Sequence, residues 1–182
     1  MPEPVVIVDY DPAWPARYED LRARVSPVLA ELAVAIDHVG STAVPGLAAK
    51  PTIDLVVRLR SAADLPVAIG RLAGLGYAHE GDFGIKGREA FATPPGYATH
   101  DHHLYVCLPD WPGYDDQIAF RDHLRANPDA AGAYEALKRL LAARHGADRT
   151  AYTNGKAAFV GDVLERSRAL PQFHRAPPTI PR

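Results

Sequence analysis

The segment TIDLVVRL, residues 52–59, constrains the fold more than any other part of the chain. It is a nearly continuous apolar run, and such a run predicts a strand buried inside a sheet. One carboxylate, Asp54, interrupts it. Because a buried charge without a partner is strongly unfavourable, Asp54 needs a partner or a ligand. We therefore expect a functional role for Asp54; a solvated strand end or an ion pair with Lys50 is the simpler alternative.

A Gly-Ser pair, Gly40 and Ser41, precedes this run and follows a shorter predicted strand, AIDHV at residues 35–39. At the start of a helix, such a turn can offer backbone N–H groups and a hydroxyl to phosphate oxygens. It is also the composition of an ordinary turn, with glycine for backbone freedom and serine as a cap. The pair followed by Asp54 has the layout of a site for phosphates and a divalent metal.

The rest of the chain predicts an α+β fold: a mixed β-sheet with flanking helices and a C-terminal helical region. Strands are expected in VVIV (5–8), YAHE, IKGREAFAT and HHLYVCL. Helices are expected at 15–34 with an interruption at Ser26–Pro27, at 65–75 with Asp64 as cap, at 115–126, at 128–146 with Asn127 as cap, and at 149–170.

The length of 182 residues fits one domain. We expect this domain at residues 1–170, with a sheet-containing core at 1–112 and a helical part at 113–170. The proline-rich segment 171–182 is expected to be a flexible tail.

Composition and charge limit the function classes. The net charge of −2 argues against a strong electrostatic surface for nucleic acid or membrane, although a local basic groove stays open. The single cysteine, Cys107, excludes an internal disulfide and fits a reducing compartment. No apolar run approaches the ~20 residues of a membrane span, and the start of the chain does not read as a signal peptide. We expect a cytoplasmic protein without a membrane partner.

Several segments together resemble the GrpB family of bacterial proteins, over residues 9 to about 168. They are YDPAWPARYEDL, HVGSTAVPGLAAKPTIDLVV, THDHHLYV, AFRDHLRANPDAAGAYEALKRLLA and AYTNGKAAFV. The resemblance implies the fold of polymerase-β-like nucleotidyltransferases. Members of the GrpB family occur alone or fused to dephospho-CoA kinase. The resemblance therefore predicts the fold more strongly than it predicts an activity.

The nucleotidyltransferase motif places a hydrophobic-flanked Asp-x-Asp after the Gly-Ser pair. Here Asp54 takes the second acidic place and Thr52 takes the first, so one carboxylate is missing. A further ligand is expected from the strand HHLYV, where alternation puts His103 and Tyr105 on one face and His102 on the other. Family members tend to have a His-x-His pattern in this strand, and this chain has Tyr105 in place of the second histidine.

The resemblance implies Asp54, His103 and, as a weaker candidate, His102 as metal ligands. The cofactor would be a divalent metal, Mg or Mn, or else Zn, and imidazoles suit Mn²⁺ or Zn²⁺ better than Mg²⁺. The alternative interpretation of HDHH, residues 100–103, is a loop that enters an edge strand with exposed imidazoles.

Basic and aromatic residues are candidates for holding the rest of a nucleotide. Phosphate charge would be neutralised by cations, and a base could stack on a tyrosine. Tyr134 and Lys138 lie four positions apart, as do Tyr152 and Lys156, so each pair shares a helix face. The alternative is that the tyrosines pack in the core and the lysine stems cover them. The candidates that hold phosphate or base are Gly40, Ser41, Lys50, Arg88, Arg121, Tyr134, Lys138, Tyr152 and Lys156.

Three hypotheses follow. The first is a nucleotidyltransferase that moves a nucleoside monophosphate from an NTP to an acceptor, with Asp54 and Lys50 as catalytic residues and a divalent metal. The second is a non-catalytic module that binds a nucleotide or a CoA-like phosphate ligand, which the missing carboxylate at Thr52 favours. The third is a histidine-based metalloenzyme, which requires three ligands around one point. The sequence leaves open whether the protein is an enzyme.

Overall fold

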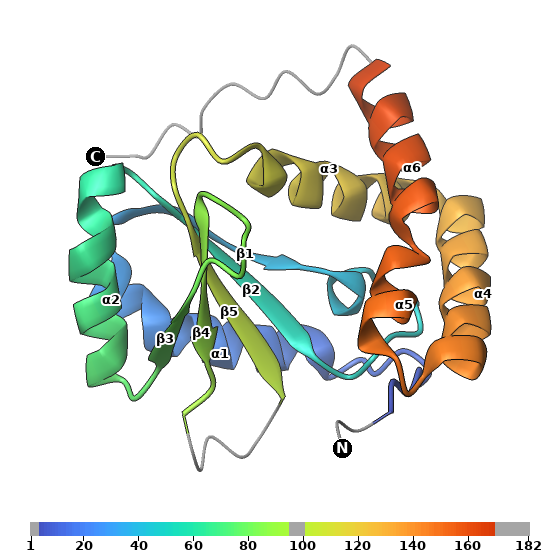
Figure 1. Cartoon of the computed structure of the whole chain (residues 1–182), viewed down its shortest axis with the longest axis horizontal. Coiled ribbons are helices and arrows are strands. Elements are labelled where there is room, and N and C mark those ends of the chain that lie inside the picture. The colour runs from blue at the N-terminus through green and yellow to red at the C-terminus, as the bar shows by residue number, and fades with distance from the viewer. Residues whose placement is uncertain (1–3, 95–100, 170–182) are drawn as a thin grey trace.

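The computed structural model describes residues 4–94 and 101–169 (Figure 1). Its centre is a five-stranded mixed sheet with the strand order β1-β2-β5-β4-β3. Strands β2 and β5 run parallel, and the other neighbours are antiparallel. The strands are β1 (Ala33–Val39), β2 (Ile53–Leu59), β3 (Ala78–Gly81), β4 (Arg88–Ala92) and β5 (His102–Cys107). The prediction of an α+β fold with a mixed sheet is confirmed.

Two helices, α1 (Trp14–Leu29) and α2 (Leu65–Gly74), cover one face of the sheet. Alternate residues of the central strands point into this layer, among them Leu55, Val57 and Leu104. Each fully buried side chain of this size stabilises the fold by roughly 1.5–3 kcal/mol before the loss of chain entropy is counted. This layer is the main hydrophobic core.

The opposite face of the sheet carries the remaining residues of the same strands. Val56 of β2 and Cys107 of β5 pack there against Tyr114 and Ile118 of helix α3 (Pro112–Ala126). Burial raises the pKa of the Cys107 thiol to about 12, as expected for a core residue. Asp54 and His103 point to this second face, beyond the end of the α3 contact.

The C-terminal helices gather on one side of this second face (Figure 1). They are α4 (Pro128–His145), α5 (Arg149–Asn154) and α6 (Ala157–Ala169). Tyr134 of α4 stacks on Phe159 of α6, and Phe120 of α3 meets both rings edge-on. These aromatic contacts hold the helical region as one layer beside the sheet.

The N-terminal part departs from two predictions. The first helix ends at Leu29 instead of residue 34, because the chain turns and enters β1 at Ala33. The predicted strand at 5–8 is reduced to an isolated bridge between Val8 and Ala49. In both places tertiary pairing overrides the local apolar pattern.

The predicted helix at 149–170 is two helices with a break around Gly155. A Cβ atom added at Gly155 would lie 2.5 Å from a methyl group of Leu141 on α4, so a larger residue at this break would require the Leu141 side chain to shift. Neither predicted cap is formed by its side chain: Asp64 makes no capping hydrogen bond, and Asn127 donates to the His123 carbonyl instead. The predicted tail at 171–182 lies outside the described residues.

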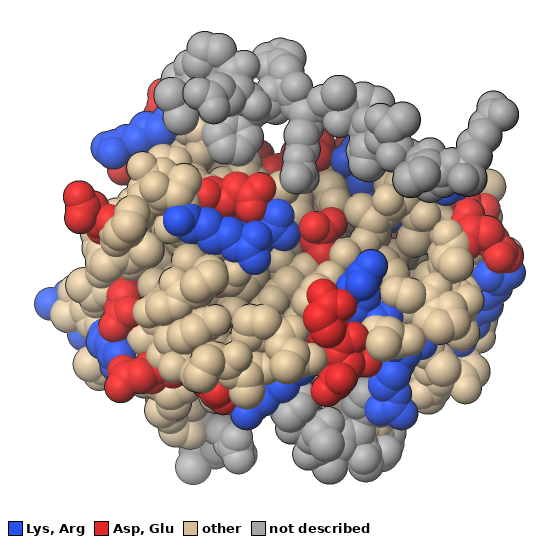
Figure 2. All heavy atoms as spheres, turned by 180° about the vertical axis from the view of Figure 1, so that it is seen from behind, with Lys and Arg blue, Asp and Glu red and all other residues tan. Residues whose placement is uncertain are grey.

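The face seen from behind carries acidic and basic side chains interspersed among other residues (Figure 2). This mixture matches the small net charge of the chain. Within residues 4–94 and 101–169, no helix combines the length and the apolar character that crossing a membrane requires.

Candidate functional site

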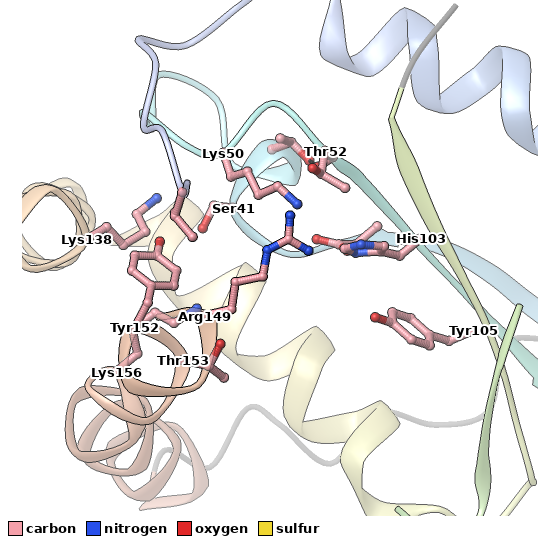
Figure 3. A pocket seen from close by; sticks show the side chains of 13 residues that line it. Ser41, Lys50, Thr52, His103, Tyr105, Lys138, Arg149, Tyr152, Thr153 and Lys156 are labelled. Carbon is pink, nitrogen blue, oxygen red and sulfur yellow. Dashed lines mark hydrogen bonds and ion pairs between the residues drawn. The ribbon is translucent and has the colours of Figure 1, made fainter. Parts of the chain in front are cut away.

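A cavity of about 340 Å³ lies between the second face of the sheet and the helices α4 and α5 (Figure 3). Strands β2 and β5, the segment around Ser41 and the residues before β2 form its other walls. The side chains that line it are Val5, Ser41, Thr42, Lys50, Thr52, Asp54, His103, Tyr105, Lys138, Arg149, Tyr152, Thr153 and Lys156.

Asp54 and His103 form the strand side of the cavity. They are register partners in the parallel pair β2–β5, so their side chains emerge next to each other on the same face. The distance between His103 Nδ1 and Asp54 Oδ1 is 2.8 Å. Because an ionised carboxylate only accepts, Nδ1–H is the donor in this hydrogen bond. Asp54 therefore has a hydrogen-bond partner, as expected for a carboxylate within an apolar run.

Gly40 makes room for the Asp54 carboxylate. Its backbone has φ of +72°, and an added Cβ would lie 2.3 Å from Asp54 Oδ2. The Gly-Ser pair is thus explained in two parts. Gly40 lets the turn after β1 approach Asp54, and Ser41 begins the short 3₁₀ turn η1 (Ser41–Ala43) and faces the cavity.

A second carboxylate, which the sequence analysis missed, lies beside Thr52. Asp101 precedes β5, and its Oδ2 accepts a hydrogen bond of 2.8 Å from Thr52 Oγ1. Lys50 Nζ lies 3.7 Å from the same oxygen. Burial alone would raise the pKa of Asp101, but the Thr52 hydrogen bond and the Lys50 charge together hold it below its usual value. Thr52 thus binds a carboxylate instead of supplying one.

These donors do not fit the two-metal centre that the fold implies. Within residues 4–94 and 101–169, no group of three His, Cys, Asp or Glu side chains could hold a metal ion. Asp54 is already bonded to His103. The structure does not bring His102 to this point: it is buried on the other face of β5, 2.9 Å from the Tyr77 hydroxyl. The three-ligand arrangement of the third hypothesis is likewise not formed by these residues.

Four basic side chains line the cavity: Lys50, Lys138, Arg149 and Lys156. Arg149 extends from α5 toward the strand side, where Lys50 and His103 also project (Figure 3). Asp54 is the one carboxylate among the described lining residues. The balance of charge in the cavity is therefore positive, although the whole chain is slightly acidic.

Lys138 is the most buried of these cations, with 2% of its surface exposed. Its amino group donates to the Ala48 carbonyl and lies 5.0 Å from the centre of the Tyr134 ring. Burial, together with the nearby positive charges of Lys156 and Arg139, lowers the pKa of Lys138 from 10.5 to about 7, against the opposing charge of Glu135.

The two predicted Tyr–Lys pairs have different roles. Tyr134 is buried in the stack with Phe159 and Phe120, so the packing alternative holds for this ring. Tyr152 lines the cavity, but Lys156 Nζ lies 4.5 Å from the centre of its ring. Burial lowers the pKa of Lys156, opposed by the charge of Asp54.

Two predicted phosphate ligands lie outside the cavity lining. Arg121 is buried and donates to the His38 carbonyl and to Asp37 and Asp122, so it joins α3 to β1. Arg88 stacks over the ring of Tyr105, with 4.4 Å between its guanidinium carbon and the ring centre. The interpretation of both residues as direct phosphate ligands is not supported by this geometry.

Arg149 and Thr153 are cavity residues that the sequence analysis did not assign. Together with Tyr152 and Lys156, they follow the i, i+3, i+4, i+7 spacing of one helix face. That spacing is the signal that could have found them.

The fold and this cavity define a protein with a nucleotidyltransferase-like fold and a cationic site. A structure of Cid1 in complex with its short product ApU aligns with a TM-score of 0.50 at 12% identity, over 72% of this chain and 42% of that chain. At this identity, the likeness concerns the fold alone.

The chain belongs to the GrpB protein family, whose model matches residues 4–166. The crystal structure of a conserved GrpB protein from Enterococcus faecalis aligns with a TM-score of 0.79 and 31% identity, over 89% of this chain and 96% of that one. The glutamate-rich protein GrpB of Alkalihalophilus pseudofirmus is 34% identical over 163 residues, which are 88% of this chain and 94% of that protein.

Two longer relatives match over part of their length. A UPF0157 protein of Bacillus subtilis is 32% identical over 90% of this chain, and a protein of Mycolicibacterium paratuberculosis named dephospho-CoA kinase is 30% identical, also over 90%. The chain spans about half the length of these two relatives, 47% and 46% respectively.

The contact between Gly40 and Asp54 predicts that Gly40→Ala destabilises the fold more than Gly46→Ala does. Both glycines have positive φ, so both variants incur backbone strain of roughly 1–3 kcal/mol. At Gly40, where ψ is −174°, the backbone conformation is one that essentially only glycine adopts. Only at Gly40 would the new methyl group also meet a side chain, because nothing lies within 4 Å of a Cβ at Gly46. Urea denaturation of both variants measures the difference. Equal losses of stability would contradict the proposed contact.

The burial of Lys138 predicts a pH-dependent gain in stability for Lys138→Met. Because the folded-state pKa of about 7 lies below the unfolded value of 10.5, the folded protein binds fewer protons between these two pH values. The free energy of unfolding of wild type therefore rises as pH increases from 7 to 10.5. Below pH 7 the lysine is charged in both states, and the full cost of burying that charge remains. The advantage of Lys138→Met should be largest near pH 7 and shrink toward pH 10, as measured by urea denaturation. A stability advantage that is constant with pH would show that burial does not lower the pKa of Lys138.

Proposed function

We propose that this chain binds the phosphate groups of a nucleotide or a CoA-like ligand in the cavity between the sheet and α4–α5. The observation that carries the proposal is the gathering of Lys50, Lys138, Arg149 and Lys156 around one cavity with a single carboxylate among its described lining residues. Phosphate oxygens are strong acceptors for such cations, and charge-assisted hydrogen bonds are about twice as strong as neutral ones.

The surroundings of the cations support an anionic ligand. A buried ammonium group is unfavourable unless it is paired, and Lys138 has only a neutral carbonyl and a ring as partners in the described residues. Hydroxyl groups of Ser41 and Thr153 line the same cavity and can donate to phosphate oxygens. A bound anion would offset the cost of burying Lys138.

The names of relatives support the class of ligand. A protein related over nearly the whole of this chain is named dephospho-CoA kinase, which is the reason for including a CoA-like ligand. The Cid1 structure with the product ApU supports a nucleotide ligand for a protein of the same fold.

Nucleotidyl transfer from an NTP to an acceptor is the second candidate. It is favoured by one observation: Asp54 is retained on β2 and is held in a fixed position by His103 and Gly40. Asp54 and Lys50 would then be the catalytic residues. The weakness of this candidate is the metal site, because Thr52 replaces a carboxylate and Asp101 pairs with Thr52 and Lys50.

Calorimetric titration with ATP, GTP, CTP, UTP and CoA, each in EDTA and in Mg²⁺ or Mn²⁺, separates the two candidates. Phosphate binding by side-chain cations predicts binding in EDTA and a loss of affinity of at least about tenfold in Lys156→Met, since one charged hydrogen bond contributes about 1.5–3 kcal/mol. Lys86→Met is the matched control, because Lys86 is exposed and is not a lining residue.

The other outcomes are equally informative. Binding that requires the metal and is abolished by Asp54→Asn would favour nucleotidyl transfer and would justify a search for the acceptor. Failure of all four nucleotides and of CoA to bind would overturn both candidates.

A further inference from the structure

Two lysines lie on the helix side of the cavity. Lys138 comes from α4, and Lys156 follows α5 in the break before α6. Figure 3 shows both on the same side as Tyr152, with Ser41 facing them. Within residues 4–94 and 101–169, no carboxylate forms an ion pair with either amino group; their neighbours are the Ala48 carbonyl and the rings of Tyr134 and Tyr152.

Among the described residues, no carboxylate pairs directly with Lys138. Glu135, one turn earlier on α4, accepts hydrogen bonds from the Ala48 backbone N–H at 3.1 Å and from Arg139 at 3.0 Å. Its carboxylate is therefore already shared by other donors. The other charged groups near Lys138, namely Lys156 and Arg139, are positive. Burial and this repulsion, against the charge of Glu135, lower the pKa of Lys138 to about 7, so a bound anion would stabilise its charged form.

We infer that Lys138 and Lys156 form a subsite for a terminal phosphate group. This inference rests on the proposed function and deepens it. It selects ligands that end in a free phosphate, and it disfavours ligands whose phosphates are all internal diesters.

The reason is charge matching. A terminal phosphate carries about −1.5 to −2 at pH 7, because its second pKa is about 6. Two ammonium groups match this charge, and their mutual repulsion is offset only when the dianion lies between them. An internal diester phosphate carries a single negative charge and would leave one buried cation uncompensated. Since burial lowers the pKa of Lys138 in the free protein, we expect proton uptake from solvent when the dianion binds.

Two matched ligand pairs test the subsite. ADP and ADP-ribose share the same diphosphate, but in ADP-ribose the outer phosphate is esterified. CoA and dephospho-CoA differ only in a phosphomonoester on the ribose. Whichever pair is discriminated identifies the source of the terminal phosphate: a nucleotide or a CoA-like molecule.

The experiment is calorimetric titration at pH 7.5 in EDTA, with each ligand in two buffers of different ionisation enthalpy, which gives the number of protons taken up. Wild type should bind ADP or CoA at least about tenfold more tightly than its partner, a difference of about 1.4 kcal/mol. Lys138→Met should remove this preference and reduce the proton uptake measured for wild type. Lys156→Met should remove the preference while Lys86→Met leaves both quantities unchanged.

The failures are distinguishable. If none of the four ligands binds, the proposed function itself is wrong. If both members of each pair bind equally well, or if Lys138→Met keeps the wild-type preference, the terminal-phosphate subsite is wrong and the proposed function stands. Thermal unfolding of Lys138→Met shows that it is folded, because methionine keeps the length of the buried stem and removes a charge from the interior.

Discussion

The organisation of this molecule depends on the position of one carboxylate. Asp54 lies where three segments meet: the turn after β1, strand β2 itself and strand β5. The antiparallel pairing of β1 with β2 brings Gly40 against one carboxylate oxygen, and the parallel pairing of β2 with β5 brings His103 to the other. A larger residue at position 40 would displace the carboxylate, so the tight turn and the charge are parts of one arrangement. That arrangement fixes one wall of the cavity.

The other wall supplies positive charge in place of acidic ligands. The helical region places Lys138, Arg149 and Lys156 opposite Asp54, and the segment before β2 adds Lys50. Burying Lys138 beside other cations is unfavourable in the free protein. A bound dianion would turn this unfavourable arrangement into a source of affinity. We propose that this chain holds phosphate through side-chain cations instead of divalent metals, because its cavity carries four basic side chains and a single carboxylate among the described lining residues.

The sequence predicted those features that depend on local periodicity. Alternation along the β5 segment correctly put His103 with Tyr105 and set His102 apart, and helical spacing found Tyr152 with Lys156. Features that depend on long-range packing were missed or misassigned. A spacing of four cannot tell the core face of a helix from the cavity face, so Tyr134 was indistinguishable from Tyr152. Likewise, Arg121 donates hydrogen bonds to Asp37 and the His38 carbonyl, which are distant in the sequence. The position of the Asp101 carboxylate beside Thr52 depends on the register of β2 with β5.

A crystal structure of the protein with ADP and Mn²⁺, or with CoA and Mn²⁺ if that is the ligand that binds, tests the central claim most directly, because anomalous scattering locates the metal independently of the phosphates. We expect a terminal phosphate in contact with Lys138 and Lys156, and no manganese within coordination distance of Asp54. Manganese bound by Asp54 and bridged to the phosphates would contradict it, and would show that this chain uses the metal chemistry implied by its fold.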